Sequence, residues 1–208
     1  MTLFSVSSPS DSAAIVILAG GMSSRFGSDK ALAPWNDRGS ILDNVIEAAY
    51  SSCSQVALSV KEASDYPEKK IRKIPDVIKG MGPLGGLYSA FVHLEAQWIM
   101  VLACDMPLVE PLLLRHMLGL KTWAPAIVPY CRGRFEPLHA IYHRSLLPLV
   151  EYLLENRRLK MRQLLDPLPK YLVSEAEVIK VAGSLECLSN INTLQEFKRL
   201  SPRNFFQK

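Results

Sequence analysis

The chain has 208 residues, of which 49% are hydrophobic, and its 24 Lys and Arg against 20 Asp and Glu give a formal net charge of +4. This length allows a domain with a sizeable buried core. So small a net charge does not indicate a nucleic-acid or membrane-surface partner. No apolar run approaches the roughly 18 residues that a membrane-spanning helix needs, so no membrane partner is expected.

The cysteines and the N-terminal residues bear on compartment and domain organisation. The four cysteines lie far apart and include no CxxC pair, which disfavours a zinc site and a disulfide framework and fits a reducing cytoplasm. Residues 1–12 lack the basic segment and the apolar stretch of a signal peptide and are predicted to form a flexible tail. Residues 13–208 contain no linker or internal repeat and are predicted to form a single domain.

The first half of the chain alternates apolar runs with helical spacings. A continuous apolar run at 14–19 predicts a buried strand, and a long loop follows to about Arg38. The next predicted elements are a helix over 41–49, strands at 55–60 and 71–75, a helix at 84–94, and the most hydrophobic strand, at 98–103.

The second half continues the alternation with shorter elements. They are a helix at 111–120, strands at 126–130 and 138–142, helices at 146–155 and 161–165, a short strand near 178–181, and a last helix opened by Thr193. Strands alternating with helices predict a three-layer α/β/α fold around a mostly parallel sheet. Ligands bind such folds beyond the carboxyl ends of the strands, which selects residues 19–30, Asp76 and Asp105.

The glycine-rich segment after the first strand, LAGGMSSRFGSDKAL at 18–32, has the composition of a phosphate cradle. Glycines let backbone N–H groups approach phosphate oxygens, while Arg25 and Lys30 neutralise charge. Two residues separate Gly27 from Lys30, which excludes a Walker A loop because that motif needs Gly-Lys in succession. The alternative is a plain strand-to-helix connection, but its length and its two cations favour anion binding.

A second glycine motif, GMGPLG at 80–85, matches G-x-G-x-x-G and has Asp105 about 20 residues further on, as a dinucleotide fingerprint requires. That fingerprint must follow a strand directly, whereas residues 75–79 intervene here. We therefore predict a turn that leads into the helix near Leu84.

Asp105 is delivered by the most hydrophobic strand to the edge that holds the glycine-rich segment. Mg²⁺ binds through one or two carboxylates together with substrate phosphates, so Asp105 is the candidate metal ligand. The alternative is a turn or N-cap residue before Pro107. Asp76 also follows a predicted strand, but for this residue the alternative interpretation, a turn residue after Pro75, has more weight than it has for Asp105.

The remaining polar residues give weaker indications. His139 and His143 lie on a strand and at its end, where their spacing does not make a metal pair. There is no G-x-S-x-G elbow, and Cys104 is interpreted as a core thiol. The basic cluster at 157–162 is either a solvated helix face or part of a site for a polyanionic small molecule.

Several ordered motifs together resemble those of one family. Residues 18–21, 24–27 and 29–32 resemble the LAGG-x-S-x-R-[MF]-G-x-DK-x-L signature of the molybdenum cofactor guanylyltransferases, in the nucleotide-diphospho-sugar transferase superfamily. The resemblance runs from about 14 to 200. It includes a D…GPLxG segment at 76–87, a CDxP segment at 104–107, a PL-x-A-x-Y strand at 137–142 and an N-x-N-T turn at 190–193.

The resemblance implies a Rossmann-like nucleotidyltransferase fold over 13–208 and three groups of site residues. The catalytic group is Arg25, Lys30 and Asp105, with Asp105 also holding Mg²⁺. The group that meets GTP is Leu18, Ala19, Gly20, Gly21, Lys30, Asp76 and Asp105. The group near the pterin substrate is Arg134, Asn190 and Asn192. The chain departs from the family at Ser59, where some relatives have an Asn that touches the nucleotide, and at 34–40, which replaces a compact turn.

Together these observations predict an enzyme that transfers GMP from GTP to the phosphate of molybdopterin and releases pyrophosphate, with molybdoenzyme maturation proteins as further partners. A cytidylyltransferase acting on the same pterin is the nearest alternative, and those relatives usually carry LAAG at 18–21. A sugar-phosphate nucleotidyltransferase is more distant, because its loop more often reads GxGTR-M. A non-catalytic GTP-binding module that delivers the cofactor is the alternative from another class.

Overall fold

The computed structural model describes residues 12–19, 30–37, 39–120, 124–191 and 193–201. The predictions for Gly20, Gly21, Arg25 and Asn192 fall outside the described residues, as does the predicted tail up to residue 11. Ser12, which that tail included, is bound to the sheet: its carbonyl accepts hydrogen bonds from the backbone of Gln97 and Trp98, at 3.0 and 3.1 Å.

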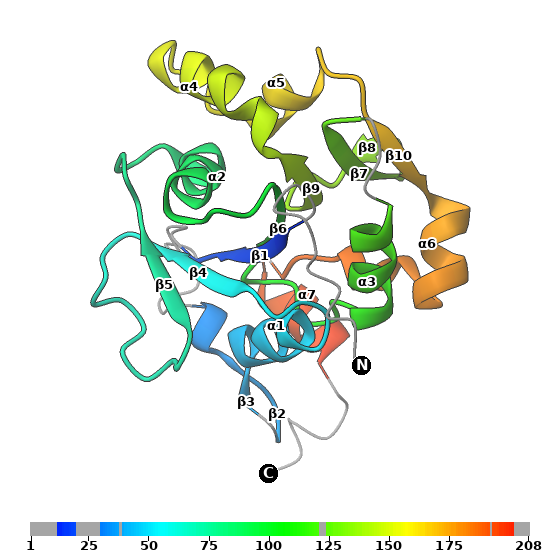
Figure 1. The fold of residues 1–208 in the computed structure, drawn as a ribbon. Helices are drawn as coiled ribbons and strands as arrows, with labels where there is room; N and C mark the ends of the chain where they lie inside the picture. The colour runs from blue at the N-terminus through cyan, green and yellow to red at the C-terminus, as the bar shows by residue number, and fades with distance from the viewer. Residues whose placement is uncertain (1–11, 20–29, 38, 121–123, 192, 202–208) are drawn as a thin grey trace, which may run out of the picture.

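A central sheet contains eight strands within the described residues (Figure 1). In spatial order the path is β10 (Tyr171–Ser174), β7 (Ala126–Cys131), β9 (His139–His143), β6 (Trp98–Ala103), β1 (Ala13–Leu18), β4 (Val56–Val60) and β5 (Arg72–Pro75), and β8 (Arg134–Phe135) pairs with β7. The strand β9 runs antiparallel to both of its neighbours, while β10 and β7, and the strands from β6 to β5, pair in parallel. The predicted mostly parallel sheet is confirmed.

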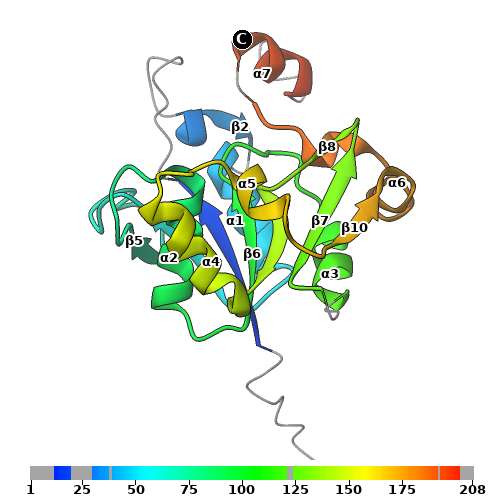
Figure 2. The same cartoon turned by 90° about the horizontal axis from the view of Figure 1, so that it is seen from above.

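Helices cover both faces of the sheet, as the predicted three layers require (Figures 1 and 2). One face is covered by α2 (Gly82–His93), α4 (Leu147–Glu155) and α5 (Met161–Leu165), and the other by α1 (Ile41–Tyr50), α3 (Pro111–Gly119) and α6 (Glu175–Ala182). Every residue of β6 is buried, because this strand has helices on both sides. Its uniformly apolar sequence is therefore a consequence of its central place.

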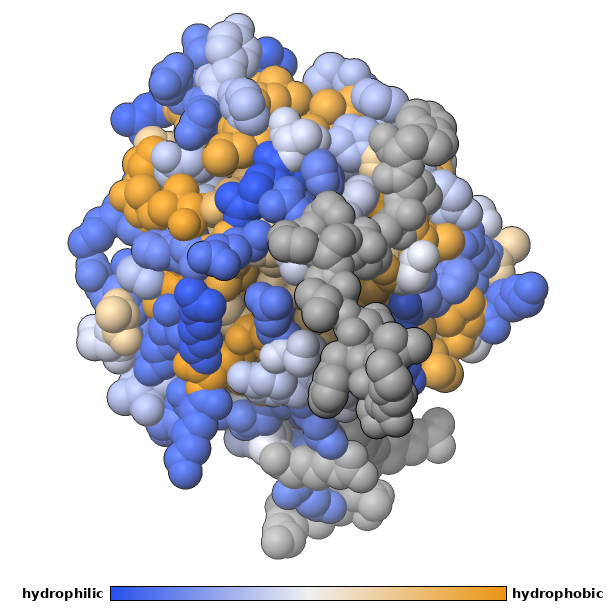
Figure 3. Space-filling model, in the orientation of Figure 1, coloured by the Kyte–Doolittle hydropathy of each residue, from blue (hydrophilic) through white to orange (hydrophobic). Residues whose placement is uncertain are grey.

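The surface on the side of α2 and α4 carries hydrophobic residues among hydrophilic ones (Figure 3). A groove of about 280 Å³ lies there, lined by the apolar side chains of Ile78, Met81, Tyr88 and Leu154 and by three charged residues. None of the helices in the described ranges is long and apolar enough to cross a membrane.

Smaller elements surround the sheet. They are η2 (Lys30–Leu32), the hairpin of β2 (Pro34–Asn36) and β3 (Gly39–Ser40), η3 (Arg144–Leu146), η4 (Leu185–Leu188) and α7 (Leu194–Leu200). The sequence predicts a loop to about Arg38, but η2 and β2 lie within that range and β3 follows it directly. Trp35 of β2 meets Phe197 of α7 edge to face, with ring centroids 5.7 Å apart, and Ile41 and Ile191 complete this small apolar cluster.

The strand predicted near 178–181 is wrong, because these residues belong to helix α6. The β-branched Val178 and Val181 suggested a strand, but local caps favour a helix. The Ser174 hydroxyl accepts a hydrogen bond from the N–H of Glu177, and Gly183 ends the helix at a φ of +78°. The strand of this region is instead β10, which precedes the helix.

Candidate active site

The carboxyl ends of β1 and β6 meet at one edge of the sheet, since Leu18 is in register with Ala103. Asp105 follows β6 by two residues and is 7% exposed. The Lys30 ammonium nitrogen lies 2.5 Å from Oδ2 of Asp105, although 75 residues separate them. Lys30 and Asp105, which the resemblance assigns to one catalytic group, therefore meet at this edge.

A third segment joins this ion pair through its backbone. Nζ of Lys30 also donates to the carbonyl oxygen of Ile191 at 3.0 Å, and the Ile191 N–H donates to the carbonyl of Asp105 at 2.9 Å. Asn190, which the resemblance places near the pterin, is partly buried next to Ile191. Sequence reasoning missed Ile191, because a backbone carbonyl leaves no signature in the residue type.

Oδ1 of Asp105, the second carboxylate oxygen, is buried and accepts no hydrogen bond from the described residues. A buried acceptor without a partner costs free energy unless something else satisfies it. The residues in the described ranges contain no group of three or more His, Cys, Asp or Glu that could hold a metal. A single orphaned carboxylate fits Mg²⁺, which takes one or two protein carboxylates and completes its shell with phosphates and water.

The entrance to the glycine-rich segment is held from three sides. The Leu18 carbonyl accepts a hydrogen bond from the N–H of Cys104 at 3.3 Å, and the Ala19 N–H donates to Ser59 at 2.9 Å. The Tyr66 hydroxyl donates to the Ala19 carbonyl, also at 3.3 Å. The backbone of both predicted nucleotide contacts is therefore fixed.

The GPLGG segment brings α2 close to this entrance. A Cβ atom at Gly86 would lie 2.7 Å from Cδ2 of Leu18 and 3.2 Å from Oγ of Ser59, so a glycine allows the close approach. Residues 76–81 separate β5 from α2, whose N-terminal turn contains Gly82 and Pro83. The predicted turn into a helix, rather than a dinucleotide fingerprint, is confirmed.

Asp76 is the first residue after β5 and lies at the same edge of the sheet. Its N–H donates a hydrogen bond to the carbonyl oxygen of Val60 at 2.8 Å. Burial raises the pKa of its carboxyl, while Lys61 lowers it and Asp65 raises it. In the sheet, β4 and β1 stand between β5 and β6, so Asp76 and Asp105 border opposite sides of the glycine-rich segment's entrance.

Arg134 begins β8 and is in register with Cys131, the last residue of β7. Because β7 runs parallel to β6, Arg134 lies at the same edge of the sheet as Asp105. It follows a tight turn in which Arg132 and Gly133 have φ of +52° and +73°, as a type I′ hairpin requires. Its side chain is 66% exposed, and its Nε lies 2.8 Å from Oε1 of Glu136. Arg134 makes no contact with Asp105 among the interactions of the described residues.

His139 is fully buried on β9, and neither ring nitrogen has a partner among the described residues. Burial lowers the pKa of its imidazole to about 3, so it is neutral at physiological pH. His139 and His143 lie within β9, as expected. All four cysteines are free, and the sequence disfavours a disulfide framework.

The three-layer fold places a Lys–Asp pair and the entrance of the glycine-rich segment at the carboxyl edge of its parallel strands, where such folds bind ligands. Together with the family match that follows, this defines a nucleotidyltransferase. A family model described as the MobA-like NTP transferase domain matches residues 15–172, and the chain belongs to that family.

Relatives and solved structures agree. The chain is 35% identical over 199 residues to the "Probable molybdenum cofactor guanylyltransferase" of Bacillus subtilis strain 168, covering 91% of this chain and 94% of that protein. It is 32% identical over 189 residues to a protein of the same name from Bacillus cereus, with 88% and 92% covered. The crystal structure of molybdopterin-guanine dinucleotide biosynthesis protein A from Archaeoglobus fulgidus superposes with a TM-score of 0.78 at 25% identity, covering 89% of this chain and 95% of that one.

Proposed function

We propose that the chain transfers GMP from GTP to the terminal phosphate of molybdopterin, which yields the guanine dinucleotide form of the cofactor and pyrophosphate. The observation that carries the proposal is the pairing of Lys30 with Asp105, whose second carboxylate oxygen is buried without a partner among the described residues. The family and the names of its relatives supply the substrates.

The reaction needs no covalent enzyme intermediate. A phosphate oxygen of molybdopterin forms a bond to the α-phosphorus of GTP, and the bond from that phosphorus to the oxygen bridging to the β-phosphate breaks. Such chemistry leaves the protein mainly with positioning and charge neutralisation. Asp105 would hold Mg²⁺, which when bound neutralises phosphate charge. Lys30 and Arg25 supply the positive charge that the protein itself brings to the triphosphate.

The remaining assignments follow the same edge of the sheet. Leu18, Ala19, Gly20, Gly21 and Asp76 are proposed to contact the nucleotide. The proposed pterin contacts are Arg134, Asn190 and Asn192. The exposed side chain of Arg134 can reach an anionic group without crossing the core. We place the enzyme in the cytoplasm, with maturation proteins of molybdoenzymes as its further partners.

One assay separates this function from its alternatives. Pyrophosphate release is measured with each of the four nucleoside triphosphates, with and without molybdopterin, at saturating Mg²⁺. Release that requires both GTP and the pterin is expected. Pterin-dependent release with CTP but not with GTP would make the chain a cytidylyltransferase. GTP binding without any pyrophosphate release would make it a non-catalytic delivery module.

A further inference from the structure

The loop of residues 61–71, which joins β4 to β5, is exposed except at four partly buried residues, Asp65, Tyr66, Lys69 and Ile71. The backbone of Tyr66 has a φ of +51°, in the left-handed region that residues other than glycine rarely adopt. Pro67 follows, and a residue before proline favours an extended conformation. The fold thus holds Tyr66 in an unfavourable conformation, and such outliers cluster at functional sites.

The hydroxyl of Tyr66 makes a long-range contact from this strained position. It donates to the carbonyl oxygen of Ala19 at 3.3 Å, 47 residues away in the chain. The N–H of Ala19 is held by the carbonyl of Ser59 at 2.9 Å. Because a peptide unit is planar, fixing this carbonyl fixes the plane through which the chain enters residues 20–29. A carbonyl oxygen has two lone pairs, so Tyr66 orients it without using its full accepting capacity.

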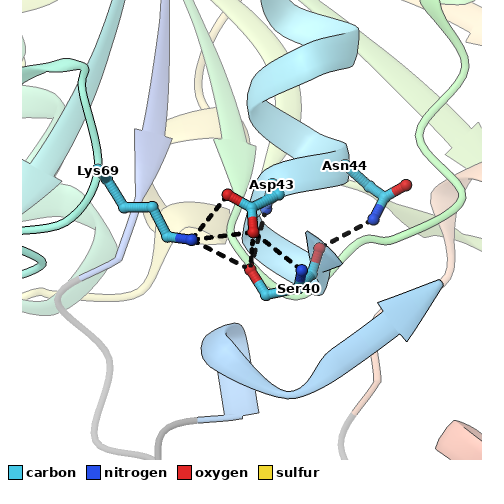
Figure 4. A network of polar contacts seen from close by, with 4 residues as sticks. All are labelled: Ser40, Asp43, Asn44 and Lys69. Atoms are coloured by element: carbon cyan, nitrogen blue, oxygen red, sulfur yellow. Dashed lines mark hydrogen bonds and ion pairs between the residues drawn. The ribbon is translucent and has the colours of Figure 1, made fainter. Parts of the chain in front are cut away.

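Lys69 anchors the loop that carries Tyr66. Its Nζ lies 2.7 and 2.9 Å from the two carboxylate oxygens of Asp43 and 3.5 Å from Oγ of Ser40 (Figure 4). Ser40 and Asp43 form the capping box of α1, the helix that the chain reaches after the glycine-rich segment and the β2–β3 hairpin. The loop therefore contacts the chain at the entrance of the glycine-rich segment and again after it.

The loop also acts electrostatically on Asp76: burial has the largest effect and raises the pKa of this carboxyl, while Lys61 of the loop lowers it and Asp65 raises it. It thus borders Ala19 and Asp76, two of the described residues that we propose as nucleotide contacts.

We propose that Tyr66 is a positioning residue that acts through Ala19. Its hydroxyl holds the entrance of the glycine-rich segment in the orientation that binds the nucleotide, and the strained backbone of Tyr66 is what aims that hydroxyl. The inference rests on the nucleotide role proposed for this segment. Because Tyr66 acts through a backbone carbonyl, its loss should weaken nucleotide binding and leave the chemical step unchanged.

The test compares Tyr66→Phe, which removes only the hydroxyl, with Tyr50→Phe, which removes the hydroxyl of a tyrosine that is 47% exposed on α1. Dissociation constants for GTP and CTP are measured by equilibrium dialysis without pterin, and KM and kcat by pyrophosphate release. Loss of one neutral hydrogen bond predicts a dissociation constant and a KM for GTP raised about three- to tenfold in Tyr66→Phe. The kcat and the KM for molybdopterin should stay within about twofold, and Tyr50→Phe should match wild type.

The inference is overturned when Tyr66→Phe binds the nucleotide as wild type does, or when its kcat falls with an unchanged KM. A purely structural role would lower the melting temperature and the active fraction but leave both KM values unchanged, and it too would overturn the inference. A wild-type protein that binds only CTP would contradict the proposed function, and the comparison of Tyr66→Phe with wild type in CTP affinity would still decide the role of Tyr66.

Discussion

Neutral His139 makes folding stability depend on pH. Its side chain is 1% exposed, and burial lowers the pKa of its imidazole from its ordinary value of 6.5 to about 3. Between these values the unfolded chain binds a proton that the folded protein does not, so stability is fully present above pH 6.5 and is lost as the pH falls toward 3. The slope is about 1.4 kcal/mol per pH unit, which gives a loss of about 2 kcal/mol between about pH 7.5 and 5.0.

The measurement is the free energy of unfolding in urea, at intervals over that pH range, for wild type and His139→Leu. Leucine has a similar volume and no titrating group, so the wild type should lose about 2 kcal/mol more than this variant over the range. Burial, aided by Arg144, also lowers the pKa of His143, but His143 is common to both proteins and cancels in the difference.

The matched control is His93→Gln, a change at an exposed histidine near the end of α2. This variant should keep the pH dependence of the wild type. An equal loss of stability in His139→Leu and wild type on acidification would contradict the prediction, because burial of a neutral imidazole would then contribute nothing to the pH dependence.

Three further predictions concern the site and its support. Lys30→Ala and Asp105→Asn should each reduce the rate of pyrophosphate release by about 100-fold or more while leaving the far-UV circular dichroism unchanged, because Lys30 supplies positive charge at the triphosphate and Asp105 would hold the Mg²⁺. Gly85→Ala should destabilise the fold by about 1–2 kcal/mol in urea unfolding, since its Cβ would lie 2.6 Å from that of Met81. Asp43→Ala should lower the free energy of unfolding, measured above about pH 5, by about 1–2 kcal/mol. The substitution removes half of the α1 capping box and the partly buried ion pair with Lys69.

Each of these predictions has a matched control variant. Lys70→Ala, at an exposed lysine, should keep full turnover, and activity retained in Lys30→Ala would show its role to be misassigned. Gly119→Ala should cause no loss, because a Cβ there meets nothing within 4 Å. Asp166→Ala, which breaks an exposed pair with Arg162, should change stability little.

The contribution of Asp43 also has a predictable pH range. Burial raises the pKa of its carboxyl. The hydrogen bonds from Lys69 and Ser40 together lower the pKa by more than burial raises it, so the net pKa is below 3.8. A lowered pKa means that this stabilisation is present above the unfolded value and is lost as the pH falls through the folded one. An equal difference between wild type and Asp43→Ala at about pH 7 and at about pH 2.5 would show that the carboxylate charge contributes nothing.

Most of the strands and helices, and the residue types at the site, could be predicted from the sequence. Apolar runs mark buried strands because a strand with helices on both faces of its sheet exposes neither set of side chains to water. Both β1 and β6 show such a run. Asp105 could be selected because it follows the apolar strand β6 by two residues, and Lys30 because it lies in the glycine-rich segment that follows β1. Where local signals conflicted, as at Val178, the caps of α6 outweighed the β-branched residues.

The direct contacts that these residues make could be known only from the tertiary structure. The contacts of Lys30 with Asp105 and with Ile191 span 75 and 161 residues, and they depend on the order of β1 and β6 in the sheet and on the path of the C-terminal segment. The contact of Tyr66 with Ala19 depends on the left-handed backbone conformation of Tyr66, which the sequence does not predict. Periodicity reports the surroundings of a single element, whereas these contacts join backbone groups and side chains from separate elements.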